Sequence, residues 1–259
     1  MLIAGGGPGG MEAARIAVLR GHEVHLYEKS DSLGGLTKSF VLAPFKAEFG
    51  DLLSFQVSQL KKSGVTVKLG QAVDSTIIDQ LKPDVVIVAA GARPIRPEIP
   101  GLHRLPVKLA EEILVGAPFG KNVVIIGGGA VGCETAEFLL DRGAKTTVVE
   151  MLDEVARDVG LLEKMLLMQR LLEKGVQFVT KAVVREITPE GKVVLEKDYK
   201  QETLAGIDTV VLAVGYASVD ELTQVETDKN VPFIAIGDCV KPRKILDAIW
   251  EGFLKAYDL

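Results

Sequence analysis

The chain contains the same glycine-rich pattern twice, at a constant separation of 122 residues. The first copy is GGGPGG, residues 5–10, and the second is GGGAVG, residues 127–132. An acidic residue follows each copy at the same distance, Glu28 in the first and Glu150 in the second. A chain of 259 residues is long enough for two domains that each bury a core. The repeat therefore predicts two domains built on one plan.

Both copies have the pattern of a strand, a tight turn, a helix and a second strand. The predicted strands and helices are residues 2–4, 11–19 and 23–27 in the first copy, and residues 122–126, 131–141 and 146–149 in the second. Strands that alternate with helices are typical of parallel sheets covered by helices. The predicted fold class is α/β, with two Rossmann-like dinucleotide-binding domains in three layers.

Each glycine of the pattern has a mechanical role in binding a dinucleotide. The first permits the tight turn, the second lets a pyrophosphate approach the backbone, and the third lets the helix pack closely on the strand. These three pairs are Gly5 and Gly127, Gly7 and Gly129, and Gly10 and Gly132. The pyrophosphate then lies at the helix N-terminus, and the acid accepts hydrogen bonds from the ribose hydroxyls. The alternative, glycine turns without a ligand, does not explain why six glycines and two acids share one spacing.

The rest of the chain suggests that one domain is inserted into the other. Apolar strands at 85–91 and 210–215 end at Gly91 and Gly215. Residues 93–101 contain three prolines and are expected to form no regular element, which makes them the crossing between domains. A strand at 231–238 and a helix from about 245 to 256 have no counterpart in the first half and are assigned back to the first domain. The predicted boundaries are 1–103 and 217–259 for the first domain, and 104–216 for the inserted second domain.

The first strand is shorter than its counterpart in the second copy, and Met1 falls at its edge. We therefore expect this chain to be part of a longer polypeptide.

Composition argues against several other classes of protein. A net charge of −5 and a pI near 5.4 give no basic surface for nucleic acid or for an anionic membrane. Two cysteines are too few for a disulfide framework and suggest a reducing compartment, so a cytoplasmic location is expected. The three histidines are scattered, and no spacing predicts a metal site or a catalytic base.

The second acid also bears on the choice of nicotinamide cofactor. Glu150 would repel a 2′-phosphate, and the following residues 151–155, MLDEV, are acidic. NADH is therefore favoured over NADPH.

Three segments carry a resemblance to a known family: GGGAVGCETAEFL at 127–139, VVEMLDEVARDVG at 148–160 and GDCVKPRKILDAIWEGF at 237–253. The chain resembles the FAD- and NAD-binding part of the pyridine nucleotide-disulfide oxidoreductase superfamily. More narrowly, it resembles the C-terminal region of the NADH:flavin oxidoreductase family that includes 2,4-dienoyl-CoA reductase, 2-enoate reductase and trimethylamine dehydrogenase. In that family an FMN-bearing barrel and an iron–sulfur motif lie upstream, and neither is in this chain.

The resemblance implies cofactor roles for individual residues. Asp238 would accept a hydrogen bond from the ribityl chain of FAD, Val73 would meet the adenine through its backbone, and Glu134 would meet the nicotinamide amide. The residues expected to bind FAD are Gly5, Gly7, Pro8, Gly10, Glu28, Lys29, Gly35, Val73, Ala90, Gly91, Gly237, Asp238 and Ile245. Those expected to bind NADH are Gly127, Gly129, Val131, Gly132, Glu134, Glu150 and Gly215.

Several residues depart from the patterns of this superfamily. Residues 30–50 contain no cysteine, which excludes the dithiol chemistry of the disulfide reductases. Cys133 and Cys239 are expected to be buried packing residues. Lys46 matches a lysine of the family, and a solvated loop position is expected for it. Trp250 stands where close relatives have histidine, and would alter the flavin environment if it touches the flavin.

The resemblance implies an FAD-dependent NADH oxidoreductase, of the NADH oxidase or enoate reductase type, that transfers hydride from NADH to FAD. Electrons would pass on to an iron–sulfur cluster and FMN in a parent protein. No catalytic side chain is expected, because the cofactors carry the chemistry. Two alternatives remain open: a nucleotide-binding module with ADP in the FAD site, and a ferredoxin or rubredoxin reductase that uses the same cofactors.

Overall fold

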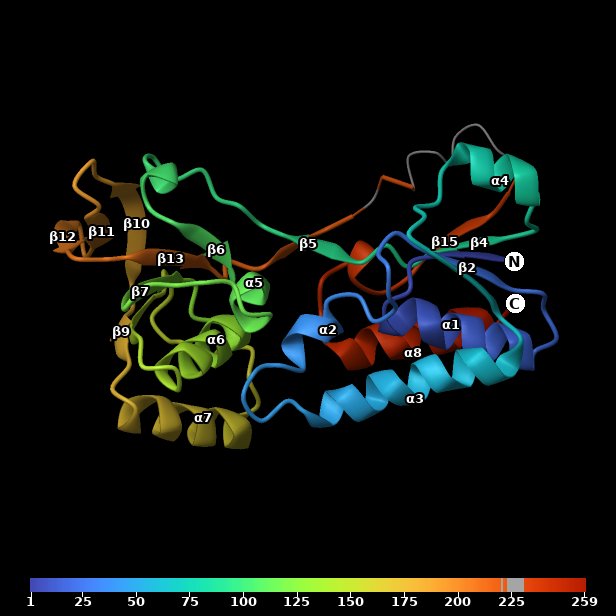
Figure 1. Ribbon diagram of the computed structural model, residues 1–259, viewed down its shortest axis with the longest axis horizontal. Coiled ribbons are helices and arrows are strands. Elements are labelled where there is room, and N and C mark those ends of the chain that lie inside the picture. Colours follow the sequence, from blue (N-terminus) through green and yellow to red (C-terminus); the bar gives the residue numbers. More distant parts are fainter. Residues whose placement is uncertain (220, 223–230) are drawn as a thin grey trace. The chain divides into compact units, whose positions relative to one another are not determined.

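The structure is a computed structural model that describes residues 1–219, 221–222 and 231–259. These residues form two compact units. Unit 1 comprises Met1–Val41, Ala47–Arg93 and Tyr216–Leu259, and unit 2 comprises Leu42–Lys46 and Pro94–Gly215. Each unit contains a five-stranded parallel sheet (Figure 1). The predicted α/β class with two Rossmann-like domains is confirmed, whereas the boundaries at 103 and 216 stay a prediction.

The sheet of unit 1 takes strands from both ends of the chain. In order across the sheet these are β15 (Phe233–Ala235), β4 (Val86–Val88), β1 (Leu2–Ala4), β2 (His25–Glu28) and β3 (Thr66–Leu69). The helices are α1 (Pro8–Leu19), α2 (Thr37–Phe40), α3 (Glu48–Ser63), α4 (Ser75–Leu81) and α8 (Ile245–Tyr257). The chain leaves β1 towards β2 on one side and later returns to β4 on the other. This reversal beside β1 is where α/β sheets bind their ligands.

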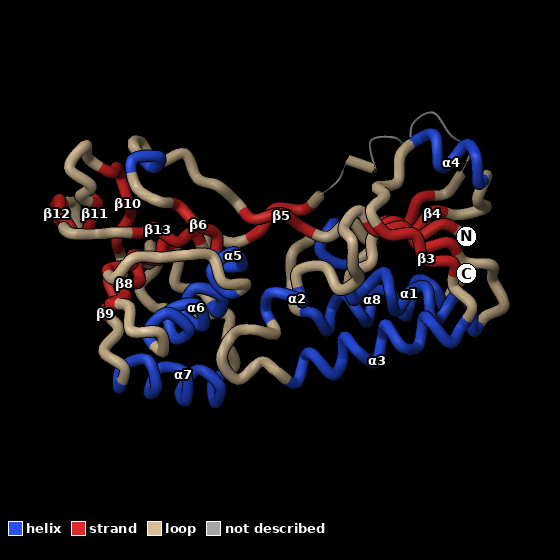
Figure 2. The backbone as a smooth tube through the Cα atoms, viewed as in Figure 1, coloured by secondary structure: helices blue, strands red, loops and turns tan. Residues whose placement is uncertain are grey.

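Strand alternation explains the two cores of unit 1, because successive side chains point to opposite faces of a sheet. Ile3 packs with Met11 and Leu26 in one core cluster, and Leu2 packs with Ile77 and Val86 in another. Helices α1, α3 and α8 cover one face and α4 the other (Figure 2).

Two glycines let α1 and α8 pack at backbone distance. A Cβ at Gly252 would lie 2.3 Å from the carbonyl oxygen of Gly9, and a Cβ at Gly9 would lie 2.8 Å from that of Ala248. Neither position has room for a side chain. This close packing fixes α8 relative to the start of α1.

Unit 2 repeats the plan and adds an antiparallel layer. Its parallel sheet has the order β6 (Val107–Leu109), β13 (Thr209–Leu212), β7 (Asn122–Ile126), β8 (Lys145–Val149) and β9 (Gln177–Val179). Its helices are α5 (Ala110–Leu114), α6 (Ala130–Leu140), α7 (Leu161–Glu173) and the 3₁₀ turn Leu102–Arg104. The added sheet, β10 (Ala182–Ile187), β11 (Val193–Lys197) and β12 (Lys200–Leu204), buries Val184 and Leu195 against Val124 and Val210.

Some expectations about local structure were wrong. The proline-rich segment was expected to form no regular element, but Arg93 and Pro94 lie in β5 (Ala92–Pro94), which pairs with β14 (Tyr216–Ser218). Proline is tolerated there because β5 is an edge strand in a two-stranded sheet. The strand expected at 231–238 is shorter, because Gly237–Cys239 forms a 3₁₀ turn in which Gly237 has φ +67°.

In the part of the chain that the structure describes, no helix combines the length and the apolar character needed to cross a membrane.

Candidate dinucleotide-binding sites

Both glycine patterns begin where the central strand of each sheet ends. Gly5 follows β1 with φ +116°, and Gly127 follows β7 with φ +105°, a backbone conformation that favours glycine. A Cβ at Gly5 would lie 2.2 Å from the carbonyl oxygen of Ala89, and a Cβ at Gly127 would lie 2.3 Å from that of Ala213. The same turn is therefore present in both units. In unit 1 it packs against the residue that follows β4, and in unit 2 against the residue that follows β13.

The third glycine of each copy is required by packing. A Cβ at Gly10 would lie 2.0 Å from the carbonyl oxygen of Gly5, and a Cβ at Gly132 would lie 2.0 Å from that of Gly127. The middle glycine of the first copy is different, because a Cβ at Gly7 would meet no atom within 4 Å. The protein's own packing does not require a glycine there, which fits a cradle whose open side receives a pyrophosphate.

Glu28 is the last residue of β2 and lies 6% exposed beside the first turn. One carboxylate oxygen accepts the N–H of Gly6 at 2.7 Å. The other accepts the N–H of Ser30 at 2.8 Å and also its hydroxyl. These donors fix the carboxylate next to the turn.

Glu150 repeats this arrangement in unit 2, where it is 8% exposed. It accepts the N–H of Gly128 at 2.6 Å and that of Leu152 at 2.8 Å, and both donors lie 122 positions after their counterparts in unit 1. A carboxylate offers about four acceptor positions, so about one remains on Glu28 and about two remain on Glu150 for ribose hydroxyls. The two copies therefore share equivalent hydrogen bonds as well as a common sequence pattern.

The other residues expected around FAD follow strand ends or helix starts in unit 1. Ala90 and Gly91 follow β4, at the same sheet edge as Gly5. Pro8 is the first residue of α1, a position that proline tolerates, and Lys29 is exposed. A Cβ at Gly35 would lie 3.3 Å from the α-carbon of Gly7, so this loop passes beside the cradle.

Two further residues expected around FAD belong to other segments of unit 1 than the glycine turn and its loop. Val73 is 9% exposed and packs in a core cluster of unit 1. Ile245 is the first residue of α8.

Asp238 follows β15 at this same edge of the sheet. It accepts the N–H of Arg243 at 3.0 Å, and Glu251 of α8 accepts the N–H of Gly237 at 2.7 Å. Burial raises the pKa of Asp238, while the N–H and charge of Arg243 oppose that rise. These contacts hold the turn in place, and they leave the second oxygen of Asp238 available for a hydroxyl donor.

Trp250 projects from α8 with 58% of its surface exposed. Its ring stacks on Phe253, with centroids 5.7 Å apart.

The residues expected around NADH lie at the start of α6 and after β13. Val131 is in the first turn of α6, where its carbonyl accepts the hydroxyl of Thr135 at 2.7 Å. Glu134 lies one turn further on, and Gly215, with φ +95°, follows β13. The start of α6 follows β7 and Gly215 follows β13, so both lie at the same edge of the parallel sheet in unit 2.

Lys46 does not occupy the solvated loop position expected for it. Its ammonium nitrogen lies 3.1 Å from a carboxylate oxygen of Glu134 and 2.7 Å from one of Glu163, and its side chain is 23% exposed. Burial raises the pKa of Glu134, and the charge of Lys46 opposes that rise. No sequence pattern indicates this contact, because Lys46 lies 88 positions before Glu134.

We expect Lys46→Met to raise the pKa of Glu134 further, because the opposing charge is removed. At pH 7 the free energy of unfolding should fall by about 1 kcal/mol, the scale of a partly exposed ion pair. This loss should shrink at low pH, where Glu134 is protonated and no longer needs the ammonium. Carbon NMR of the labelled Glu134 carboxyl group measures the pKa. Urea unfolding at several pH values measures the loss of stability. Lys164→Met, which removes an ammonium paired with Glu154, is the matched control; an unchanged Glu134 titration in Lys46→Met would contradict the expectation.

Neither cysteine is a reactive thiolate. Cys133 is fully buried, and burial together with the charge of Asp158 raises its pKa to about 12. Cys239 is also buried, and its thiol donates to the carbonyl of Val88 at 3.0 Å. Both are packing residues, as the sequence predicted. Across the described residues, no cluster of His, Cys, Asp and Glu could hold a metal ion.

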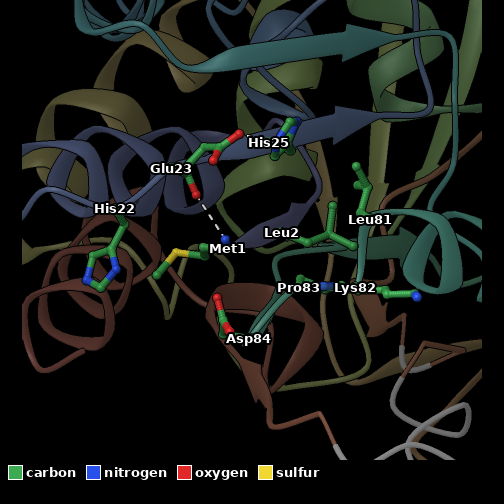
Figure 3. A pocket seen from close by; sticks show the side chains of 9 residues that line it. All are labelled: Met1, Leu2, His22, Glu23, His25, Leu81, Lys82, Pro83 and Asp84. Atoms are coloured by element: carbon green, nitrogen blue, oxygen red, sulfur yellow. Dashed lines mark hydrogen bonds and ion pairs between the residues drawn. The ribbon is translucent and has the colours of Figure 1, made fainter.

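Figure 3 shows a hollow at the amino ends of β1, β2 and β4, opposite to the glycine turn. Its lining residues are Met1, Leu2, His22, Glu23, His25, Leu81, Lys82, Pro83 and Asp84. The terminal amine of Met1 donates to the carbonyl of Glu23 at 2.9 Å, and the ring of His25 lies 3.2 Å from the carboxylate of Glu23. Parallel sheets bind ligands at their carboxyl ends, so we assign this hollow no part in dinucleotide binding.

Known proteins resemble the chain in sequence and in fold. The sequence profile of the family described as "Pyridine nucleotide-disulphide oxidoreductase" matches residues 1–252. The chain belongs to this family. The resemblance predicted from the sequence is therefore confirmed.

Individual relatives match the chain along its whole length. It is 39% identical to an NADH oxidase of Thermoanaerobacter brockii over 100% of this chain and 41% of that protein. It is 38% identical to a bilirubin reductase of Mediterraneibacter gnavus over 99% of this chain and 40% of that protein. The solved structure of a 2-naphthoyl-CoA reductase in complex with 2-naphthoyl-CoA superposes with a TM-score of 0.92 at 32% identity, covering 100% of this chain and 39% of that one. The chain thus spans about 40% of the length of these curated relatives.

Proposed function

We propose that the chain is the electron-entry module of an FAD-dependent NADH oxidoreductase, with FAD in unit 1 and NADH in unit 2. The observation that supports it most is the duplicated cradle: a glycine turn closed by a buried glutamate occurs once in each unit. When bound, FAD would accept the hydride that NADH donates. The protein's part is to bind and orient the two dinucleotides, since no acid or base is needed for the transfer.

In unit 1 the N–H groups at the start of α1 would meet the FAD pyrophosphate, because a helix N-terminus favours negative charge. Glu28 would hold the adenosine ribose, and Asp238 would accept from the ribityl chain. Gly7 leaves the backbone open on the side where the pyrophosphate approaches.

In unit 2 the start of α6 would meet the NADH pyrophosphate. Glu150 would hold the adenosine ribose and disfavour NADPH, because both its oxygens are fixed beside the turn and a 2′-phosphate would meet a carboxylate there. Glu134, which Lys46 holds in place, would meet the nicotinamide amide.

In the whole protein the electrons would pass to an iron–sulfur cluster and an FMN-bearing barrel outside this chain. The reductases among the relatives, of bilirubin and of 2-naphthoyl-CoA, favour an unsaturated organic acceptor over a protein acceptor such as ferredoxin or rubredoxin. The acceptor itself would be bound by the barrel.

Anaerobic absorbance spectroscopy tests the proposal. The purified chain is mixed with FAD, freed of unbound flavin and titrated with NADH. We expect a bound flavin band that bleaches with one equivalent of NADH and much less readily with NADPH. A protein that binds ADP but no FAD would instead support a nucleotide-binding module without turnover. Bound flavin that ignores NADH would contradict the transfer.

A further inference from the structure

The repeat continues past the two acids into the loop that follows them. In unit 1 the N–H of Gly34 donates to the carbonyl of Gly6 at 2.8 Å, and in unit 2 the N–H of Ala156 donates to the carbonyl of Gly128 at 2.7 Å. The two donors are again 122 positions apart, and both have a positive φ, +120° and +52°. Both loops therefore fold back over the glycine turn in the same way.

Two residues later the loops differ in charge. Unit 1 has Leu36, and unit 2 has Asp158 at the equivalent position. Asp158 Oδ1 accepts the N–H of Ala130 at 2.9 Å, and a Cβ at Gly129 would lie 3.5 Å from Asp158 Oδ2. No atom comes within 4 Å of a Cβ at Gly7, the counterpart of Gly129. The second cradle thus holds a carboxylate where the first is open.

The N–H of Ala130, which donates to Asp158, is also a group that an anionic ligand at the start of α6 would need. Ala130 is the first residue of α6, and the N–H groups of a first helical turn have no acceptor within the helix. Its N-cap residue, Gly129, has no side chain to satisfy them, and the first turn contains no acid. Asp158 therefore caps α6 from a loop 28 residues further along the chain.

We propose that Asp158 is an affinity-determining residue that competes with the NADH pyrophosphate for the N-terminus of α6. This inference depends on the proposed binding of NADH to unit 2. Two anions cannot share one N–H at hydrogen-bond distance without strong repulsion, so the carboxylate must move away when the pyrophosphate binds. Its displacement weakens dinucleotide binding and favours release of the oxidised product, while FAD, in a cradle without such an acid, is retained.

Substitution of Asp158 separates this role from a structural one, because the two predict opposite signs. Asp158→Asn keeps an oxygen that can cap Ala130 but removes the charge, and Asp158→Ala removes both. We expect both variants to bind NADH and ADP-ribose about tenfold more tightly, which corresponds to about 1.4 kcal/mol. Without dinucleotide, Asp158→Ala should melt at a lower temperature because it has lost the cap, whereas Asp158→Asn should stay close to the original protein.

The test is equilibrium titration by calorimetry with NADH and with ADP-ribose, together with thermal unfolding. Asp153→Asn is the matched control, because Asp153 is an exposed acid of the same loop whose carboxylate lies 3.6 Å from Arg157. We expect the affinities of Asp153→Asn for NADH and for ADP-ribose to stay within about twofold of those of the original protein.

Weaker or unchanged binding in Asp158→Asn would overturn the inference, as would equal tightening in Asp153→Asn. An original chain that binds neither probe would overturn the proposed NADH site itself, and with it this inference.

Discussion

Gly7→Ala should abolish retention of FAD while leaving the fold intact. Gly7 has φ −73° and ψ 178°, which alanine adopts without strain, and its Cβ would meet no protein atom within 4 Å. The added methyl group would instead occupy the side from which the pyrophosphate approaches the backbone. We expect the affinity for FAD to fall at least about 100-fold, or about 2.7 kcal/mol, with a melting temperature of the flavin-free protein close to the original.

Flavin fluorescence titration and thermal unfolding of the flavin-free protein measure the two effects. Gly50→Ala is the matched control, because Gly50 lies in α3 and its Cβ would also meet no atom within 4 Å. Alanine is a better helix former, so this variant should gain about 0.5–1 kcal/mol and bind FAD normally. Full FAD affinity in Gly7→Ala would show that the pyrophosphate does not lie against this turn.

Glu137→Gln should cause a large loss of stability in unit 2. Glu137 is fully buried on α6 and accepts two hydrogen bonds from Arg170, at 2.7 and 3.0 Å, and one from Lys174 at 2.9 Å. The amide would present an N–H₂ group to these cations. Breaking a buried ion pair costs about 3–5 kcal/mol, and because both cations are partly exposed we expect about 2–3 kcal/mol at pH 7.

The loss should depend on pH. Burial raises the pKa of Glu137, but the hydrogen bonds and charges of Arg170 and Lys174 outweigh it, so the pKa is lowered from its ordinary 4.5. A carboxyl group whose pKa is lower in the folded state than in the unfolded state stabilises the folded protein. This stabilisation is complete when the pH is above the pKa of the unfolded state, and it is lost as the pH falls through the pKa of the folded state. The free energies of unfolding of the original protein and of Glu137→Gln should therefore become similar at low pH.

Urea unfolding at pH 7 and at successively lower pH measures this difference. Glu196→Gln is the control, because its partner Arg185 is 52% exposed and the pair lies at the surface. That variant should lose less than about 0.5 kcal/mol. A pH-independent loss in Glu137→Gln would contradict the electrostatic explanation.

The sequence predicted those parts of the fold that depend on local geometry. A glycine turn, a helix and an acid at fixed spacing specify a single strand–turn–helix–strand unit, and the hydrogen bonds of Glu28 and Glu150 follow from that spacing. The lengths of β4, β13 and β15 were predicted too long, because an apolar run continues into the turn after a strand has left the sheet.

The contacts between distant segments could not be predicted in the same way. The pairing of Lys46 with Glu134 and that of Glu137 with Arg170 depend on how helices and loops pack, and each residue alone resembles an ordinary surface charge. The role of Asp158 could not be predicted for a related reason. Within MLDEVARDVG it is one acid among several, and only its hydrogen bond to Ala130 distinguishes it.

We propose that the two cradles bind two different dinucleotides. The most direct test is calorimetric stoichiometry, in which the chain is titrated with FAD and the FAD-loaded chain is then titrated with NAD⁺. We expect one FAD and one NAD⁺ per chain. Gly7→Ala should lose only the FAD site, and Gly129→Ala should lose only the NAD⁺ site. Two equivalents of the same dinucleotide, or one site lost in both variants, would contradict it.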